Sequence, residues 1–262
     1  MRAPRVTAIA MCAALYAAAI AVTAPIPTPW GVGHFRPGVV VPAFFALIYG
    51  PYVGGLGAAL GTFIGSIILA SVGLSNPFLS LVSGVPGNFV GFFILGCLSR
   101  VRSWYRFVWS TLASLFFGNL VAAAGVVSYF TLIIPNWASW GIEAKLGTVA
   151  GLTLFWLSSM VPFVLIVVPA LIRVTAPILS RVSVTAPRFN IVGLTQLLSM
   201  SLFLAAVLLI VFVAVQYTVL GDLFFAKIIA QDRLLWGKSL MLIAATSVAV
   251  FGPLTAVIGG SE

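Results

Sequence analysis

The chain has 262 residues, of which 62% are hydrophobic and only 6% are charged. Soluble domains carry about 25% charged residues, so this sequence has too few polar side chains to cover a water-soluble surface. The net charge of +9 comes from bases in short gaps between apolar runs, which is typical of membrane topology signals and not of a nucleic-acid-binding face. The composition predicts an all-α integral membrane protein with the bilayer as its solvent.

Eight apolar segments follow one another along the chain, and each is predicted to be a transmembrane helix. The predicted ranges are 6–24, 37–50, 51–72, 77–98, 105–134, 147–172, 191–219 and 239–258. The second range is interrupted by Pro42 and is shorter than the roughly 20 residues that a membrane span needs. We interpret 1–172 as a six-helix substrate-binding unit, 173–190 as a basic cytoplasmic linker, and 191–262 as an appended transmembrane hairpin.

The bases between these helices favour an orientation in the cell membrane with both termini in the cytoplasm. In that orientation the inside segments hold Arg2, Arg5, Arg100, Arg102, Arg106, Arg173, Arg181 and Arg188. The outside segments hold fewer bases, namely Arg36, Lys145, Lys227, Arg233 and Lys238. Both cysteines, Cys12 and Cys97, then lie toward the reducing cytoplasmic side, where no disulfide is expected.

Catalytic and energy-coupling groups are scarce in this sequence. The single histidine is His34, and none of the four acids lies in the middle of a predicted helix. A membrane metalloprotease needs a histidine pair with a carboxylate, and a proton-coupled carrier usually keeps an ionisable group inside the membrane. The glycine-rich segments also lack the Lys-Ser/Thr pair of a phosphate-binding loop. We therefore expect no enzyme activity, no metal and no cofactor.

Small residues recur every four positions on several predicted helices, a spacing that lets helices approach closely in a membrane. In the first helix they form two strips, Ala10, Ala14 and Ala18 beside Ala13, Ala17 and Ala21. These strips pack either on the protein's own helices or on a foreign helix. For Gly57, Gly61 and Gly65, and for Gly87 and Gly91, internal packing is the favoured interpretation.

Candidate ligand-binding residues lie in the proline-rich loop before the short second helix and in two membrane spans. The loop carries Trp30, His34 and Arg36, and short, proline-interrupted spans often mark binding sites in transporters. An ordinary outer loop, with Trp30 in the interfacial belt, is the alternative. Asn88 and Asn119 lie near mid-span and each needs a hydrogen-bond partner, which is either another helix or a ligand.

Three stretches, taken in order, resemble the substrate-binding S components of energy-coupling-factor (ECF) transporters, which import vitamins. They are 7–18 (TAIAMCAALYAA), 36–55 with RPGVVVP followed by LIYGPYVGG, and 84–93 (GVPGNFVGFF). The resemblance covers about residues 5–172. It implies that alanines of the first helix (Ala10, Ala14, Ala18) contact a membrane scaffold, the T component, and that two separate cytoplasmic ATPases drive transport. It also implies that 24–36 forms a lid over the ligand.

The sequence thus predicts a subunit that binds a small water-soluble nutrient, a vitamin or its precursor, for ATP-driven import. The expected ligand contacts are Trp30, His34, Arg36, Asn88, Asn119, Trp137, Trp140 and Glu143. Trp140 and Glu143 are three residues apart, so one helical turn would face both the same way. A self-contained secondary carrier or channel and a structural subunit without a ligand remain as alternatives. Family members usually have six helices, so the resemblance does not explain residues 187–262.

Overall fold

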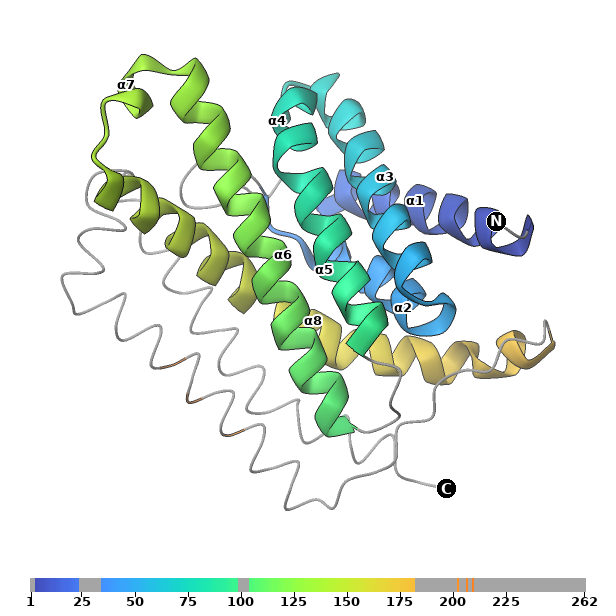
Figure 1. Cartoon of the computed structure of the whole chain (residues 1–262). Coiled ribbons are helices and arrows are strands. Elements are labelled where there is room, and N and C mark those ends of the chain that lie inside the picture. Colours follow the sequence, from blue (N-terminus) through green and yellow to red (C-terminus); the bar gives the residue numbers. More distant parts are fainter. Residues whose placement is uncertain are drawn as a thin grey trace.

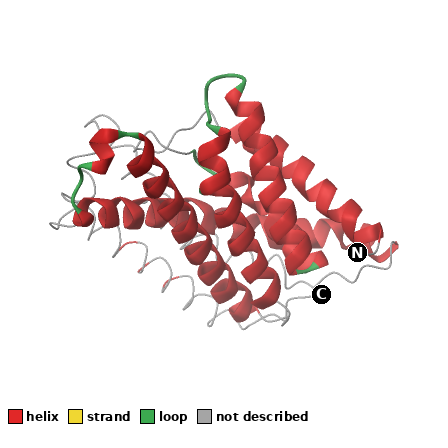
Figure 2. Ribbon diagram, turned by 45° about the horizontal axis from the view of Figure 1, so that its top comes forward, coloured by secondary structure: helices red, strands yellow, loops and turns green. Residues whose placement is uncertain are grey.

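A computed structural model describes residues 3–23, 34–98 and 104–181, together with the single positions 202, 206 and 209. Every regular element in these ranges is a helix, as Figure 1 and Figure 2 show, which confirms the all-α prediction for this part of the chain. In chain order the elements are α1 (Ala3–Thr23), η1 (Pro37–Val39), α2 (Val40–Tyr49), α3 (Pro51–Ala70), α4 (Pro77–Val82), α5 (Gly84–Leu98), α6 (Trp104–Ile133), α7 (Pro135–Ala138) and α8 (Ile142–Arg181).

Five segments of the described chain are long and apolar enough to cross a membrane. They are Pro4–Thr23, Pro51–Ala70, Pro77–Leu98, Arg106–Ile133 and Ile142–Ser180, and the shorter apolar segment Pro37–Tyr49 lies between the first two. Five of the six helices predicted within 1–172 therefore correspond to segments long enough to span a membrane, and the second, Pro37–Tyr49, is apolar but shorter. The two helices of the predicted hairpin lie outside the described residues, apart from three single positions, so the eight-helix layout stays a prediction.

The predicted helix 77–98 is divided into α4 and α5 at Ser83. Pro86 has no backbone N–H, so the carbonyl of Val82 loses its usual helical partner. Gly125 of α6 lies against this break, since a Cβ atom there would come within 2.5 Å of Val82 O. The start of α4 is fixed by Asn76, whose side chain accepts hydrogen bonds from two backbone N–H groups of the first turn.

Helix α8 is longer than the sequence predicted. It begins at Ile142 instead of 147 and ends at Arg181 instead of 172, so it includes the first half of the predicted linker. Ile172, at the predicted end, and Leu179, seven residues beyond it, are both buried, so the buried apolar face of the helix continues past that end. Three prolines lie inside this helix without ending it.

The glycines of α3 form the surface against which α1 packs. Gly57, Gly61 and Gly65 receive Cys12, Tyr16 and Ile20 of α1, in that order along the two helices. A Cβ atom at any of the three positions would come within 3.1 Å of α1 atoms. On the other side of the bundle, Gly87 and Gly91 of α5 allow a similarly close approach of α6 at Gly118 and Ala122. The prediction that these glycines serve internal packing is confirmed.

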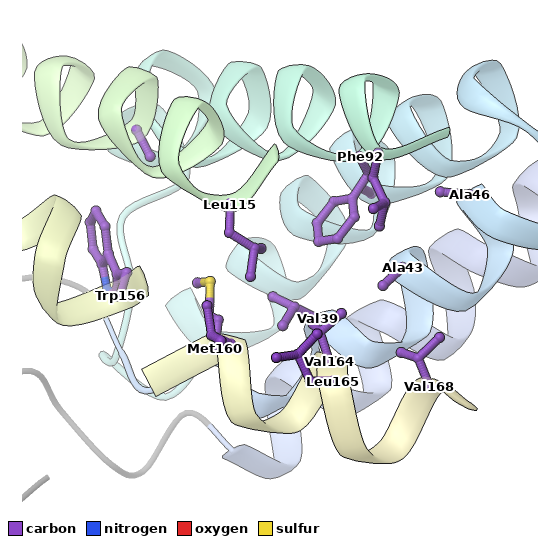
Figure 3. Close-up of a cluster of buried hydrophobic side chains, with 14 of the residues drawn as sticks. Val39, Ala43, Ala46, Phe92, Leu115, Trp156, Met160, Val164, Leu165 and Val168 are labelled. Carbon is purple, nitrogen blue, oxygen red and sulfur yellow. The ribbon is translucent and has the colours of Figure 1, made fainter. Parts of the chain in front are cut away.

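The apolar core lies where α8 packs against α2 and α6, and side chains of α5 reach the same cluster. Figure 3 shows Met160, Val164, Leu165 and Val168 of α8 facing Val39, Ala43, Phe92 and Leu115 from η1, α2, α5 and α6. Trp156 is one helical turn before Met160 and is also fully buried. This packing fixes α8 against the N-terminal helices and places Trp156 inside the bundle.

The two alanine strips of α1 have different surroundings. Ala13 and Ala17 are buried against the bundle. Ala10, Ala14 and Ala18 are all exposed. The first strip therefore serves internal packing, and the second is a smooth surface on the outside of the described bundle.

Candidate functional site

Arg36 is the centre of the candidate site. It lies just before η1, and its guanidinium carbon is 4.7 Å from the centroid of the Trp156 ring, within the range of a cation–π interaction. Burial lowers the pKa of Arg36 below its ordinary value because a poorly hydrated site disfavours the charged form, while the neighbouring Tyr16 hydroxyl opposes that shift. Within the described ranges the guanidinium has no carboxylate partner and no side-chain hydrogen bond.

Tyr16 brings a hydroxyl group from α1 to the same place. Its side chain is 0% exposed, and its ring lies on Gly61 of α3. The hydroxyl oxygen lies within reach of Thr62 and near Arg36, but the geometry leaves the Tyr16 O–H proton without an acceptor among the described residues. Most buried polar side chains have a hydrogen-bond partner, so an unpartnered hydroxyl at this position is unusual.

Thr62 and Asn88 form a connected pair beside Tyr16. Asn88 Nδ2 donates to Thr62 Oγ1 at 2.7 Å, and the Thr62 hydroxyl donates to Ala58 O at 2.7 Å. Both side chains are buried. The Asn88 amide thus has the inter-helix partner that the sequence left open, and it holds α5 to α3 next to the candidate site.

Gly84 leaves room for this cluster at the first residue of α5. A Cβ atom there would lie 3.0 Å from Thr62 Cγ2, 3.5 Å from Ser80 Oγ and 3.9 Å from Arg36 Nη2. Side chains from α3, α4 and the segment before η1 therefore meet at one glycine. Any larger residue at position 84 would push into the space between Thr62 and the guanidinium.

Trp156 completes the group from α8. Its ring faces Arg36, and its Nε1–H is buried without a hydrogen-bond partner among the described residues. Arg36, Tyr16 and Trp156 thus bring unpartnered hydrogen-bond donors and an aromatic face together inside an apolar bundle. Such a combination of apolar walls and a few polar groups is typical of small-molecule binding sites.

The structure places the predicted loop and span residues as follows. His34 Nε2 donates to Leu74 O at 2.8 Å, which ties the end of the 24–36 loop to the turn between α3 and α4. Trp30 lies outside the described residues. Asn119 Nδ2 donates to the thioether sulfur of Met160 at 3.5 Å, and a thioether is a weak acceptor. Of the predicted residues, Arg36 and Asn88 are therefore brought into one cluster.

Trp137, Trp140 and Glu143 lie at the turn between α6 and α8. The two indole rings stack on each other with centroids 4.3 Å apart, and Trp137 also contacts Phe130. Glu143 is exposed in the first turn of α8, a position that favours an acid because of the helix dipole. The prediction that one helical turn carries Trp140 and Glu143 was wrong, because α7 ends at Ala138 and α8 begins only at Ile142.

Sequence reasoning missed Tyr16, Thr62 and Trp156. The available signal was the position of Tyr16 and Trp156, since both lie in the middle of apolar spans and not at the interfacial ends where tyrosine and tryptophan are enriched. Thr62 gave no signal, because a threonine in a membrane helix commonly bonds its own backbone.

The fold and the site together define a multi-pass helical membrane protein that holds a small polar cluster inside its bundle. No group of histidine, cysteine and acidic side chains suited to a metal ion occurs among the described residues. The chain belongs to the family of ECF-type riboflavin transporter S components, whose family model matches residues 2–174. This is a family of transporter subunits and not of enzymes, as the sequence resemblance predicted. No curated protein and no solved structure matches the chain.

Proposed function

We propose that this chain is the substrate-binding subunit for ATP-driven import of riboflavin or a closely related flavin. The family match over residues 2–174 carries this proposal. The cluster of Arg36, Tyr16 and Trp156 supports it, because a polar vitamin needs hydrogen-bond donors once it leaves water for an apolar bundle. Asn88, Asn119, Trp137, Trp140 and Glu143 are proposed as further ligand contacts.

The energy for transport is proposed to come from other chains. Membership of the S-component family supports two separate cytoplasmic ATPases and a membrane T component as the source of ATP hydrolysis and the scaffold, and the sequence itself contains no phosphate-binding loop. The exposed strip of Ala10, Ala14 and Ala18 is the proposed docking surface for the T component, since small residues allow close contact between membrane helices. Residues 1–172 form the proposed binding unit, and 191–262 an appended hairpin behind the 173–190 linker.

The proposed orientation puts both termini in the cytoplasm and the 24–36 loop on the outer side. In that orientation the loop covers the ligand from outside, with Trp30 as a proposed contact. The hydrogen bond from His34 to Leu74 O supports this role, because it anchors the end of the loop on the α3–α4 turn.

Purified protein tests the proposal directly. We expect it to retain a small molecule with flavin absorbance, identified as riboflavin or a relative by mass spectrometry, and to quench the fluorescence of added riboflavin at a stoichiometry near one. Thiamine, a water-soluble vitamin without an isoalloxazine ring, is the control ligand. Absence of saturable riboflavin binding by well-folded protein would refute the assignment of a flavin.

A further inference from the structure

Three hydrogen-bond donors lie together without an acceptor among the described residues, and they indicate how the site selects its substrate. We infer that Tyr16 O–H, Trp156 Nε1–H and the Arg36 guanidinium together recognise a hydrogen-bond-accepting edge of the ligand. The site then takes neutral or anionic heteroaromatic rings that carry carbonyl acceptors, and it excludes cationic rings. This inference rests on the proposed function and adds the specificity-determining residues to it.

Burial of the Tyr16 and Trp156 donors is the first argument. Both side chains are 0% exposed, and neither donor has a partner among the described residues. A buried donor that lacks an acceptor destabilises the protein, whereas an apolar side chain of the same shape would not. An acceptor brought by the ligand removes this penalty, so binding is favoured by groups that are unfavourable in the empty protein.

The position of Arg36 is the second argument. Its guanidinium lies over the Trp156 ring at 4.7 Å, and its Nη2 atom lies beside Gly84, where Thr62 also approaches, one residue along α3 from the Gly61 on which Tyr16 packs. Three donors from α1, from the segment before η1 and from α8 therefore surround one region. Three donors in this arrangement can bond several acceptors on one edge of a planar ligand. A heteroaromatic ring with two carbonyl groups and a ring nitrogen next to them has such an edge.

Charge is the third argument. Arg36 has no carboxylate partner in the described ranges, and the single acid there, Glu143, is exposed in the α6–α8 region. The local charge is therefore positive, and solvent screens it only in part because Arg36 is half-buried beside the fully buried Tyr16 and Trp156. A carbonyl oxygen or an anion would be attracted to the guanidinium, whereas a cationic ring would be repelled by it.

The decisive variant is Tyr16→Phe, which removes the hydroxyl and keeps the ring on Gly61. We expect it to weaken riboflavin affinity about tenfold, or about 1.4 kcal/mol. The melting temperature of the ligand-free protein should be unchanged or higher, because an unpartnered buried hydroxyl is lost. A purely structural role would lower both quantities together.

Tyr129→Phe is the matched control. The Tyr129 hydroxyl accepts a hydrogen bond from Asn76 Nδ2 at 2.9 Å, so this variant should lower the melting temperature and leave riboflavin affinity unchanged. Arg36→Gln is a second variant that tests the same inference if Tyr16→Phe fails to fold. It keeps amide donors but removes the charge, and it should weaken riboflavin binding at least tenfold in folded protein.

The outcomes separate the two proposals. Unchanged riboflavin affinity in folded Tyr16→Phe, or in folded Arg36→Gln where Tyr16→Phe does not fold, overturns this inference and leaves the flavin assignment intact. Competition of thiamine with riboflavin at similar concentration in the wild type also overturns it, because a cationic ring would then be accepted. Failure of the wild type to bind riboflavin overturns the proposed function and this inference together.

Discussion

Replacing Gly61 by alanine tests whether the contact between α1 and α3 sets the position of Tyr16. The new Cβ atom would lie 2.8 Å from Ala13 O and 3.0 Å from Tyr16 Cβ and Cδ1. These are a backbone atom and the inner part of a side chain, so α1 must move as a whole. Overpacking of this kind costs about 1–3 kcal/mol. Alanine in place of glycine returns about 1 kcal/mol through helix propensity.

The net expectation for Gly61→Ala is a loss of up to about 2 kcal/mol in the free energy of unfolding. Because Tyr16 would be displaced, riboflavin affinity should also fall about tenfold, or about 1.4 kcal/mol. Thermal unfolding in detergent, followed by circular dichroism, and titration of riboflavin fluorescence measure the two effects on the same preparation.

Gly65→Ala is the matched control on the same helix pair. A Cβ atom there would lie 3.1 Å from Ile20 Cγ2 and 3.2 Å from Ile20 Cβ and Cδ1, so it meets no backbone atom of α1 and needs only a small shift of one side chain. We expect a stability change within about 0.5 kcal/mol and wild-type riboflavin affinity, since propensity gain and repacking cost offset each other. Equal effects of the two substitutions, or a more stable Gly61→Ala protein, would refute the argument that α1 is held at Gly61 through backbone contact.

Three further predictions concern docking, the binding unit and topology. Ala14→Trp should keep riboflavin binding but prevent co-purification with a T component. Its control, Ala13→Trp, should destabilise the protein because Ala13 is buried. Co-purification of a complete complex with Ala14→Trp would mean that the T component docks on another surface. Truncation after Arg181, the last residue of α8, should leave a monodisperse protein in detergent that binds riboflavin, and aggregation would mean that the C-terminal region is needed. A cysteine in place of Ser103 should be labelled only from the cytoplasm and one in place of Ser139 only from outside; the reverse pattern would invert the topology.

Much of the helical fold could be predicted because a bilayer imposes simple conditions on sequence. A span must be apolar over a fixed length, so hydropathy alone located the six segments that the structure describes within 1–172. The positions of prolines predicted the ends of helices less well. Pro86 accompanies a break between α4 and α5, whereas Pro177 lies inside α8 and does not end it. Neighbouring helices decide which of these interruptions is tolerated.

The candidate site could be predicted only in part. Arg36 and Asn88 were identifiable because charged and amide side chains are costly near a membrane interior and therefore noticeable. Tyr16 and Trp156 were missed, because each is 140 residues from the other in sequence and neither is unusual in an apolar helix by itself. Their role in the candidate site became visible only in the structure, where both bring hydrogen-bond donors without acceptors close to Arg36.

Composition, hydropathy and the spacing of small residues thus determined that this is a helical membrane protein, and they marked α1 and α3 as helices that pack closely. The tertiary structure decided which surface each strip meets: Ala13 is buried against α3, and Ala14, the next residue, is exposed. Spacing at every fourth residue defines a strip but not its partner, because all strips of small residues are equally able to accept a helix. Only the packing of the remaining helices selects one strip for the interior.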